Sequence, residues 1–423
     1  MAFVIGFGPA IPDLVFANTG LGLQISILAM CAMGVLTFAS RPMIPRRLFG
    51  DPLVWLALVF ALSVIPLLGI RGIGADAPLL KWSRQLSTVL IMLGASIALS
   101  LACDSSVNVK RWLIAGVVSG GVFTLLTSCF FLLAHAFGAH LQLWHNNLSF
   151  VSAAGALPAV AVRDAESVLP RVYGFFTEPS FFSAFAAPTG AFMTALPIFR
   201  ARPWSLNSLC ACSAGVLLLL VAILVSSRTG TLTGIFALIA IALARRRSLR
   251  LLITTSFVAT FVAPLTLAIS PIFAADNLAT VDVSVLERTA AAAIGLSEFR
   301  AHPVLGVGFG AFGFAYNDGG DLAVSDVEKL LTVVTEQQNA SSTLPNAFNL
   351  VVRLAAETGI IGLATLALLV ASLGRSAVRG TASTRAASVA AIAFLVASID
   401  SFVMMQFWVF WALARASDSP GDD

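Results

Sequence analysis

The sequence has very little charge for its length. Lysine, arginine, aspartate and glutamate make up only 11% of the 423 residues, whereas 58% are hydrophobic. Charged groups are too scarce to cover the surface of a water-soluble domain of this size, so that class of protein is excluded. With a mean hydropathy of +0.93, the composition indicates a membrane protein.

Cysteine and histidine are few and scattered. The five cysteines lie in or at the edge of apolar stretches, which argues against a disulfide framework or a zinc site: Cys31, Cys103, Cys129, Cys210 and Cys212. The four histidines have no metal-ligand spacing: His135, His140, His145 and His302. Asp164 and Glu166 come closest to an acidic metal-binding pair, but beside Arg163 they are typical of a solvated loop. We expect no metal and no cofactor.

Apolar stretches that could cross a membrane as helices recur along the whole chain. They predict an all-α polytopic membrane protein, a single domain over 1–423 with eleven or twelve transmembrane helices. The predicted spans lie near 3–18, 20–40, 52–70, 85–103, 112–138, 181–199, 208–226, 229–244, 251–273, 350–374, 386–400 and 402–414. The N-terminus has no basic region or small-residue cleavage pattern, so no cleavable signal peptide is expected.

The positions of lysine and arginine predict the orientation, because short basic loops stay in the cytoplasm. Fifteen of the 25 cations fall in alternate loops that we place on the cytoplasmic side: Arg41, Arg46, Arg47, Lys110, Arg111, Arg200, Arg202, Arg245, Arg246, Arg247, Arg250, Arg375, Arg379, Arg385 and Arg415. The net charge of +4 is thereby explained by topology, and no nucleic-acid partner is expected.

The other ten cations lie on the opposite face or at its membrane edge, against the topological bias: Arg71, Lys81, Arg84, Arg163, Arg171, Arg228, Arg288, Arg300, Lys329 and Arg353. Binding an anion is one reason to keep them there. The two long loops predicted on this face, 139–180 and 274–349, are where function is expected to concentrate.

The first long loop ends in "RVYGFFTEPSFFSAF", which places Arg171 and Glu178 just before an apolar helix. Pro179 suits the first turn of that helix and Glu178 suits its positive dipole end, so a purely structural role stays open.

In "LVSSRTGTLTG", Arg228 stands in a short turn between two apolar helices. It either faces an internal anion or snorkels to lipid headgroups.

The second long loop begins with an amphipathic helical pattern around Arg288 that His302 and Pro303 should end before a glycine-rich turn. Gly308, Gly310 and Gly313 match a dinucleotide-binding pattern by chance, since no strand precedes them.

Further on, Asn349, Arg353 and Glu357 are spaced four residues apart along one face of a predicted helix. These residues could line a site, or Arg353 and Glu357 could form an ion pair that only fixes the helix.

Four blocks between residues 171 and 362 resemble, in order, those of the O-antigen polymerase and O-antigen ligase superfamily. They are the "RVYGFFTEPS" run, the "SSRTG" turn, the segment from Arg288 through "HPVLGVGFGAF", and "NLVVRLAAETGIIG". The resemblance implies a GT-C-like, inverting, metal-independent glycosyltransferase of the inner membrane, acting on the periplasmic side. Its donor would be a glycan on undecaprenyl pyrophosphate.

Carried over to this sequence, the resemblance implies that Arg171, Arg228 and Arg288 bind the pyrophosphate. We predict Arg300, Asn349 and Arg353 as further substrate-binding residues. Guanidinium groups suit this task because they can stabilise charge developing on a departing diphosphate. Ligases of the superfamily typically carry a His-Asn pair where this sequence has Phe348 and Asn349. The missing histidine favours a polysaccharide polymerase and leaves Glu178, then Glu357, as candidate general base.

A ligase to another acceptor and a transporter of lipid-linked oligosaccharide stay as alternatives. A transporter is less favoured, because the predicted spans between 52 and 273 carry charge only at their ends and show no repeated halves. The expected partners are lipid-linked oligosaccharide donor and acceptor, membrane lipids, and possible helpers of such a polymerase, namely a chain-length regulator and a flippase.

Overall fold

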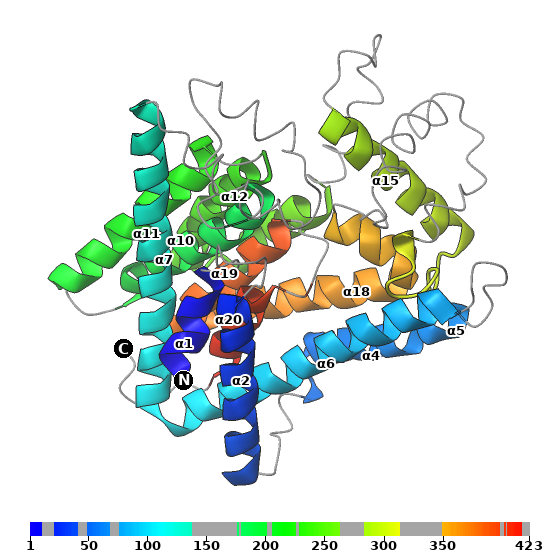
Figure 1. The fold of residues 1–423 in the computed structure, drawn as a ribbon, viewed down its shortest axis with the longest axis horizontal. Helices are drawn as coiled ribbons and strands as arrows, with labels where there is room; N and C mark the ends of the chain where they lie inside the picture. The colour runs from blue at the N-terminus through cyan, green and yellow to red at the C-terminus, as the bar shows by residue number, and fades with distance from the viewer. Residues whose placement is uncertain are drawn as a thin grey trace.

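The computed structural model describes residues 1–10, 21–40, 49–67, 76–137, 176, 179–200, 205–225, 228–262, 283–313, 349–397, 402 and 404–416. Within these ranges the secondary structure is helical and contains no strand (Figure 1). The helices are α1 (Ala2–Phe7), η1 (Gly8–Ala10), α2 (Leu21–Ser40), α4 (Pro52–Leu62), α5 (Val64–Leu67), α6 (Asp76–Ser105), α7 (Val107–Ala136), α10 (Pro179–Phe199), α11 (Leu206–Val225), α12 (Arg228–Arg245), α13 (Leu249–Phe257), η2 (Val258–Val262), α15 (Val283–Ala301), α18 (Leu350–Arg379), α19 (Ala382–Val396) and α20 (Met405–Arg415).

Five helices in the described ranges are long and apolar enough to cross a membrane: Pro78–Ser105, Val107–Ala136, Phe181–Phe199, Leu206–Leu224 and Leu350–Arg379. Five shorter apolar helices accompany them: Ile25–Ser40, Pro52–Leu67, Gly230–Arg245, Leu249–Phe261 and Ala382–Val396. The chain is therefore an all-α, multi-pass membrane protein, as predicted. The count of eleven or twelve spans stays a prediction.

Several predicted spans differ in their bounds from the observed helices, and two of these differences have a clear local cause. The span predicted to begin at 112 begins at Val107, because the side chain of Ser106 accepts a hydrogen bond from the N–H of Val109 and caps the helix. Lys110 and Arg111, predicted in a loop, lie in its first turn. The span predicted at 52–70 divides into α4 and α5 at Ser63, since Pro66 has no N–H for the carbonyl of Leu62.

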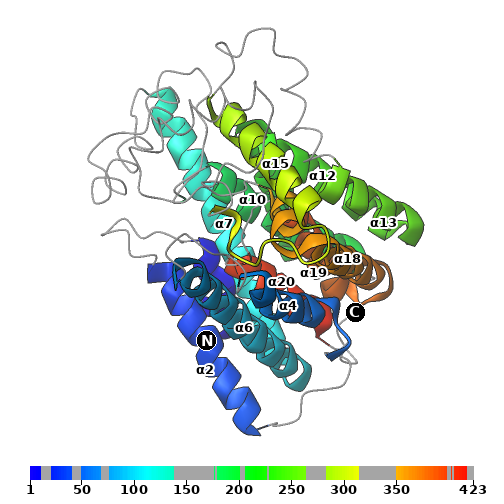
Figure 2. The same cartoon turned by 90° about the vertical axis from the view of Figure 1, so that its right-hand side faces the viewer.

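The centre of the bundle is formed by α19 and α20. Every residue of α19 is buried, and in α20 only Arg415 is not fully buried. In Figure 2 these helices lie between α4 and α6 on one side and α10 and α12 on the other, and direct contacts join α19 to α10, α12 and α18 and α20 to α6. Neighbouring helices therefore enclose α19 and α20 on all sides.

Side-chain contacts join the helix ends at one end of the bundle. Arg385, at the start of α19, donates to Ala244 O at the end of α12 (2.6 Å) and to Ala377 O near the end of α18 (3.0 Å). Arg415, at the end of α20, forms an ion pair with Asp51 before α4 and hydrogen bonds to Ser372 and Ser376 of α18. The helix ends that the cation pattern predicts on one side of the membrane are thus in contact with one another.

Candidate functional site

The candidate site is built on the chain segment that follows α15, residues 302–312, which we call the glycine segment. The helix ends at Ala301, as His302 and Pro303 predict. Gly306, Gly308 and Gly310 have φ values of 67°, 109° and 86°, in the region that glycine adopts far more readily than other residues. The segment follows a helix and not a strand, which agrees with our rejection of a dinucleotide-binding motif.

The glycine segment lies against a break in α18 at Gly359, whose φ and ψ are 63° and −156°. In a continuous helix the N–H of Ile360 would donate to Ala356 O. Here it donates to Pro303 O (2.8 Å), and Ala356 O accepts from the N–H of Val307 (2.8 Å). The N–H of Gly308 likewise donates to Glu357 O (3.0 Å). The segment thus satisfies backbone groups freed by the break, as buried backbone groups require.

Glycine is needed on both sides of this contact. A Cβ at Gly359 would overlap the carbonyl of Val304, and one at Gly306 would overlap the backbone of Ala356 and Glu357. The two backbones can therefore approach to hydrogen-bonding distance only because neither residue has a side chain.

The first turns of α18 carry the residues that the sequence predicted. Asn349 is the N-cap, and its Oδ1 accepts from the N–H groups of Val351 (2.8 Å) and Val352 (3.2 Å). One turn later, Arg353 Nε donates to Glu357 Oε2 (3.0 Å). The alternative of an Arg353–Glu357 ion pair is therefore present, and it is buried: the two side chains are 10% and 1% exposed.

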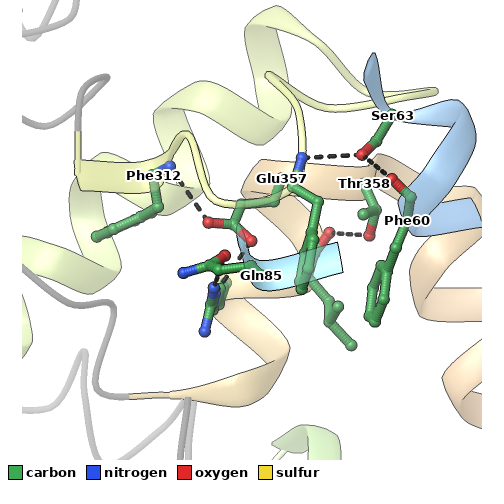
Figure 3. A network of polar contacts seen from close by, with 9 residues as sticks. Phe60, Ser63, Gln85, Phe312, Glu357 and Thr358 are labelled. Carbon is green, nitrogen blue, oxygen red and sulfur yellow. Dashed lines mark hydrogen bonds and ion pairs between the residues drawn. The ribbon is translucent and has the colours of Figure 1, made fainter. Parts of the chain in front are cut away.

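This ion pair has two further hydrogen-bond partners, shown in Figure 3, and one aromatic neighbour. Glu357 Oε1 accepts from the N–H of Phe312 in the glycine segment (3.2 Å). Arg353 Nη2 donates to Gln85 Oε1 on α6 (2.8 Å), and the guanidinium carbon lies 5.4 Å from the ring centroid of Phe309. A buried ion pair is favourable when additional hydrogen bonds satisfy it, and these contacts supply them.

The junction of α4 and α5 holds the other side of the glycine segment. Ser63 Oγ accepts from the N–H of Phe309 (2.9 Å) and donates to Phe60 O (2.7 Å), as Figure 3 shows. The rings of Phe60 and Phe309 stack with their centroids 4.0 Å apart. Because Pro66 ends the helix nearby, Ser63 lies where it can bind a backbone from outside α4.

Of the remaining predicted site residues, the structure describes the side chain of Arg300 alone. Arg300 is exposed in the last turn of α15. Arg228 is the first residue of α12 and Arg288 belongs to α15, but the side chains of both lie outside the described part of the structure. Arg171 and Glu178 lie outside the described residues. The helix α10 begins at Pro179, two residues before the predicted span, which agrees with a place for Pro179 in its first turn. The roles of the remaining predicted site residues stay predictions.

Sequence reasoning missed Gln85, Ser63, Gly306 and Gly359. The only available signal was weak: Gln85 is a polar residue at the predicted edge of a span, and Gly359 follows Glu357 closely in an apolar run. Within the described ranges, no group of three or more metal-binding side chains comes together. The described network is suited to holding backbone segments in place.

Comparison with known protein families gives a match over residues 213–367 to the family described as O-antigen ligase. The matched range covers the Arg228 turn, the glycine segment and the first half of α18, but not the block at 171–180. Comparison with curated proteins gives no match. Members of the matched family are glycosyltransferase-like enzymes that act on lipid-linked glycans, and the match confirms the resemblance of this membrane protein to the O-antigen polymerase and ligase superfamily.

Proposed function

We propose that this protein is a polysaccharide polymerase that joins undecaprenyl-pyrophosphate-linked repeat units on the periplasmic face of the inner membrane. The observation that carries the proposal is the O-antigen ligase family match at 213–367, combined with Phe348 where a ligase of the superfamily has histidine. A polymerase retains the glycosyl-transfer chemistry of the family, but both of its substrates are lipid-linked glycans: the growing chain and one new repeat unit.

The proposed reaction is a single displacement with inversion. The acceptor hydroxyl oxygen forms a bond to the anomeric carbon of the donor sugar as the bond from that carbon to the pyrophosphate oxygen breaks. The hydroxyl proton passes to Glu178, and undecaprenyl pyrophosphate leaves with the electron pair. Arg171, Arg228 and Arg288 would stabilise its developing charge through bidentate hydrogen bonds, which requires no metal.

The periplasmic placement rests on the cation pattern and is supported by which helix ends meet at each end of the bundle. At the end that holds the candidate site, the glycine segment contacts the end of α4, the first part of α6 and the first half of α18. At the other end of the bundle lie Asp51, before α4, Arg385, at the start of α19, and Arg415, at the end of α20. If the arginine-rich end is cytoplasmic, the candidate site is periplasmic.

Reporter fusions test this orientation. A reporter enzyme that is active only outside the cytoplasm should be active when fused after Ala165 or Ser325 and silent after Arg246. These positions lie in the two predicted periplasmic loops and in the most basic predicted cytoplasmic loop. The reverse pattern would overturn the orientation and, with it, the proposed location of the site.

A deletion strain distinguishes the polymerase from a ligase, which the description of the matched family keeps as the second candidate. Without a polymerase, single repeat units should remain on the lipid carrier and long glycan should be absent. Without a ligase, long chains would form and accumulate on undecaprenyl pyrophosphate. Gel analysis and mass spectrometry of the extracted lipid-linked glycans separate the two, and long carrier-linked chains would reject the polymerase.

A further inference from the structure

Gln85 links α6 to a network that otherwise belongs to α18 and the glycine segment. Its Oε1 accepts from Arg353 Nη2 at 2.8 Å, across 268 positions of sequence. The same oxygen lies beside Gly310, where an added Cβ would be 2.7 Å from it. Gln85 therefore lies next to the glycine segment and contacts the buried ion pair.

The turn of α6 that carries Gln85 is anchored through Trp82. One turn earlier on α6, Trp82 donates to Phe60 O (3.0 Å) and packs against an apolar cluster of Leu67, Val307 and Ala311. The glycine segment is thus packed between α6 on one side and α18 on the other. An anchored turn of α6 can present Gln85 to the guanidinium of Arg353 in a constant position.

A continuous path of contacts leads from Gln85 to α15. Arg353 connects Gln85 to Glu357, and Glu357 holds the N–H of Phe312 through Oε1 and the N–H of Gly308 through its backbone carbonyl. The glycine segment follows α15 directly, and α15 also packs on α18, where Gly295 leaves no room for a Cβ beside Val352. The position of α15 is therefore set partly by this network.

We propose that Gln85 and Glu357 are positioning residues of the glycosyl transfer. They hold the glycine segment and α15 against α18, and thereby place the arginine that α15 carries, Arg288, at the pyrophosphate. The inference rests on the proposed function. It gives Glu357 a task other than proton acceptance, since its Oε2 accepts from Arg353 and its Oε1 from a backbone N–H.

The first test changes Gln85 in the full-length, reconstituted protein. The substrate is the lipid-linked repeat unit extracted from the deletion strain. Gln85→Met keeps the size but removes the acceptor for Arg353, and Gln85→Asn shortens the side chain as a second, polar variant. We expect kcat to fall by roughly tenfold to a hundredfold, as a small misplacement of a catalytic group does, while KM changes by less than about twofold because the remote lipid and sugars still bind.

Two variants act as controls. Gln85→Glu keeps an oxygen that accepts from Arg353 and should restore kcat to within about threefold of the unchanged protein. Ser87→Leu lies on the same helix but is exposed, and its Oγ bonds only to Arg84 O of its own helix in the described contacts. It should leave both kinetic constants unchanged. Wild-type kcat in both Gln85→Met and Gln85→Asn would overturn the proposal, as would a Gln85→Glu variant as inactive as they are.

The second test separates positioning from proton acceptance at Glu357. If Glu357 only holds the glycine segment in place, Glu357→Gln should keep weak activity. The kcat/KM of this variant should still fall at low pH as it does in the unchanged protein. Loss of that fall at low pH would make Glu357 the base and reject the positioning role. A failure of the proposed function is recognised separately, because the unchanged protein would then leave the extracted repeat units unextended.

Discussion

Replacing Arg228 or Arg288 with alanine, or Glu178 with glutamine, should abolish polysaccharide while leaving the amount of protein in the membrane normal. Removing one preorganised donor to a developing oxyanion commonly lowers kcat by about 10²–10³, and the amide at position 178 could not accept the proton of the acceptor hydroxyl. Lysine at either arginine position should restore little, because an ammonium cannot reproduce a bidentate guanidinium contact. Product is measured on gels of extracted glycan, with protein quantified in the same membranes.

The matched control is Arg246→Ala, an exposed arginine at the end of α12, which should make normal product. Glu178→Gln should still bind the lipid-linked donor, since it keeps the shape of the side chain. Chelators should have no effect on the unchanged protein. Full activity of both arginine-to-alanine variants, or complete loss with a chelator, would reject the metal-independent diphosphate mechanism. Wild-type product from Glu178→Gln would assign the base elsewhere.

Gly359→Ala should sharply reduce the stability of the folded protein. The backbone at Gly359 has φ 63° and ψ −156°, which is essentially restricted to glycine, and a Cβ would overlap the Val304 carbonyl. We expect a loss of roughly 3 kcal/mol or more from strain and overlap together. The effect is measured as the melting temperature of the purified protein in detergent, with size-exclusion chromatography reporting the fraction that stays folded after heating.

Gly94→Ala is the control for this change. Gly94 is inside α6, and no atom lies within 4 Å of a Cβ placed there. Alanine at this position should be neutral or stabilise the protein by up to about 1 kcal/mol. An unchanged melting temperature for Gly359→Ala would show that the glycine segment and α18 can separate without cost, which would contradict the packing described above.

Local sequence signals predicted the elements around the site well. The start of a helix at residue 350, the Arg353–Glu357 spacing and the end of α15 before His302 each depend on residues within a few positions of one another, and each is observed. The break at Gly359 could not be predicted in this way. A glycine inside an apolar helical run costs only about 1 kcal/mol, so the pattern favours a continuous helix.

The information missing from the sequence is long-range. The break in α18 is stabilised by backbone groups more than fifty residues earlier, at Pro303, Val307 and Gly308. Gln85 finds its partner 268 positions away. Neither pairing leaves a periodic or compositional trace, because the segments that meet are ordinary when read alone. The same limit applied to the junction after α4. Pro66 can be read from the sequence, but the hydrogen bond from the N–H of Phe309 to Ser63 Oγ cannot.

The burial of α19 has a consequence for the order in which the molecule is assembled. This helix is buried along its whole length, against α10, α12 and α18, yet it follows all three in the chain. During synthesis those helices are inserted before the helix that fills the space between them exists. Until then, lipid or a provisional contact has to occupy that space, and displacing it is a late step. Nascent chains that stop short of α19 therefore lack the helix that fills the centre of the bundle.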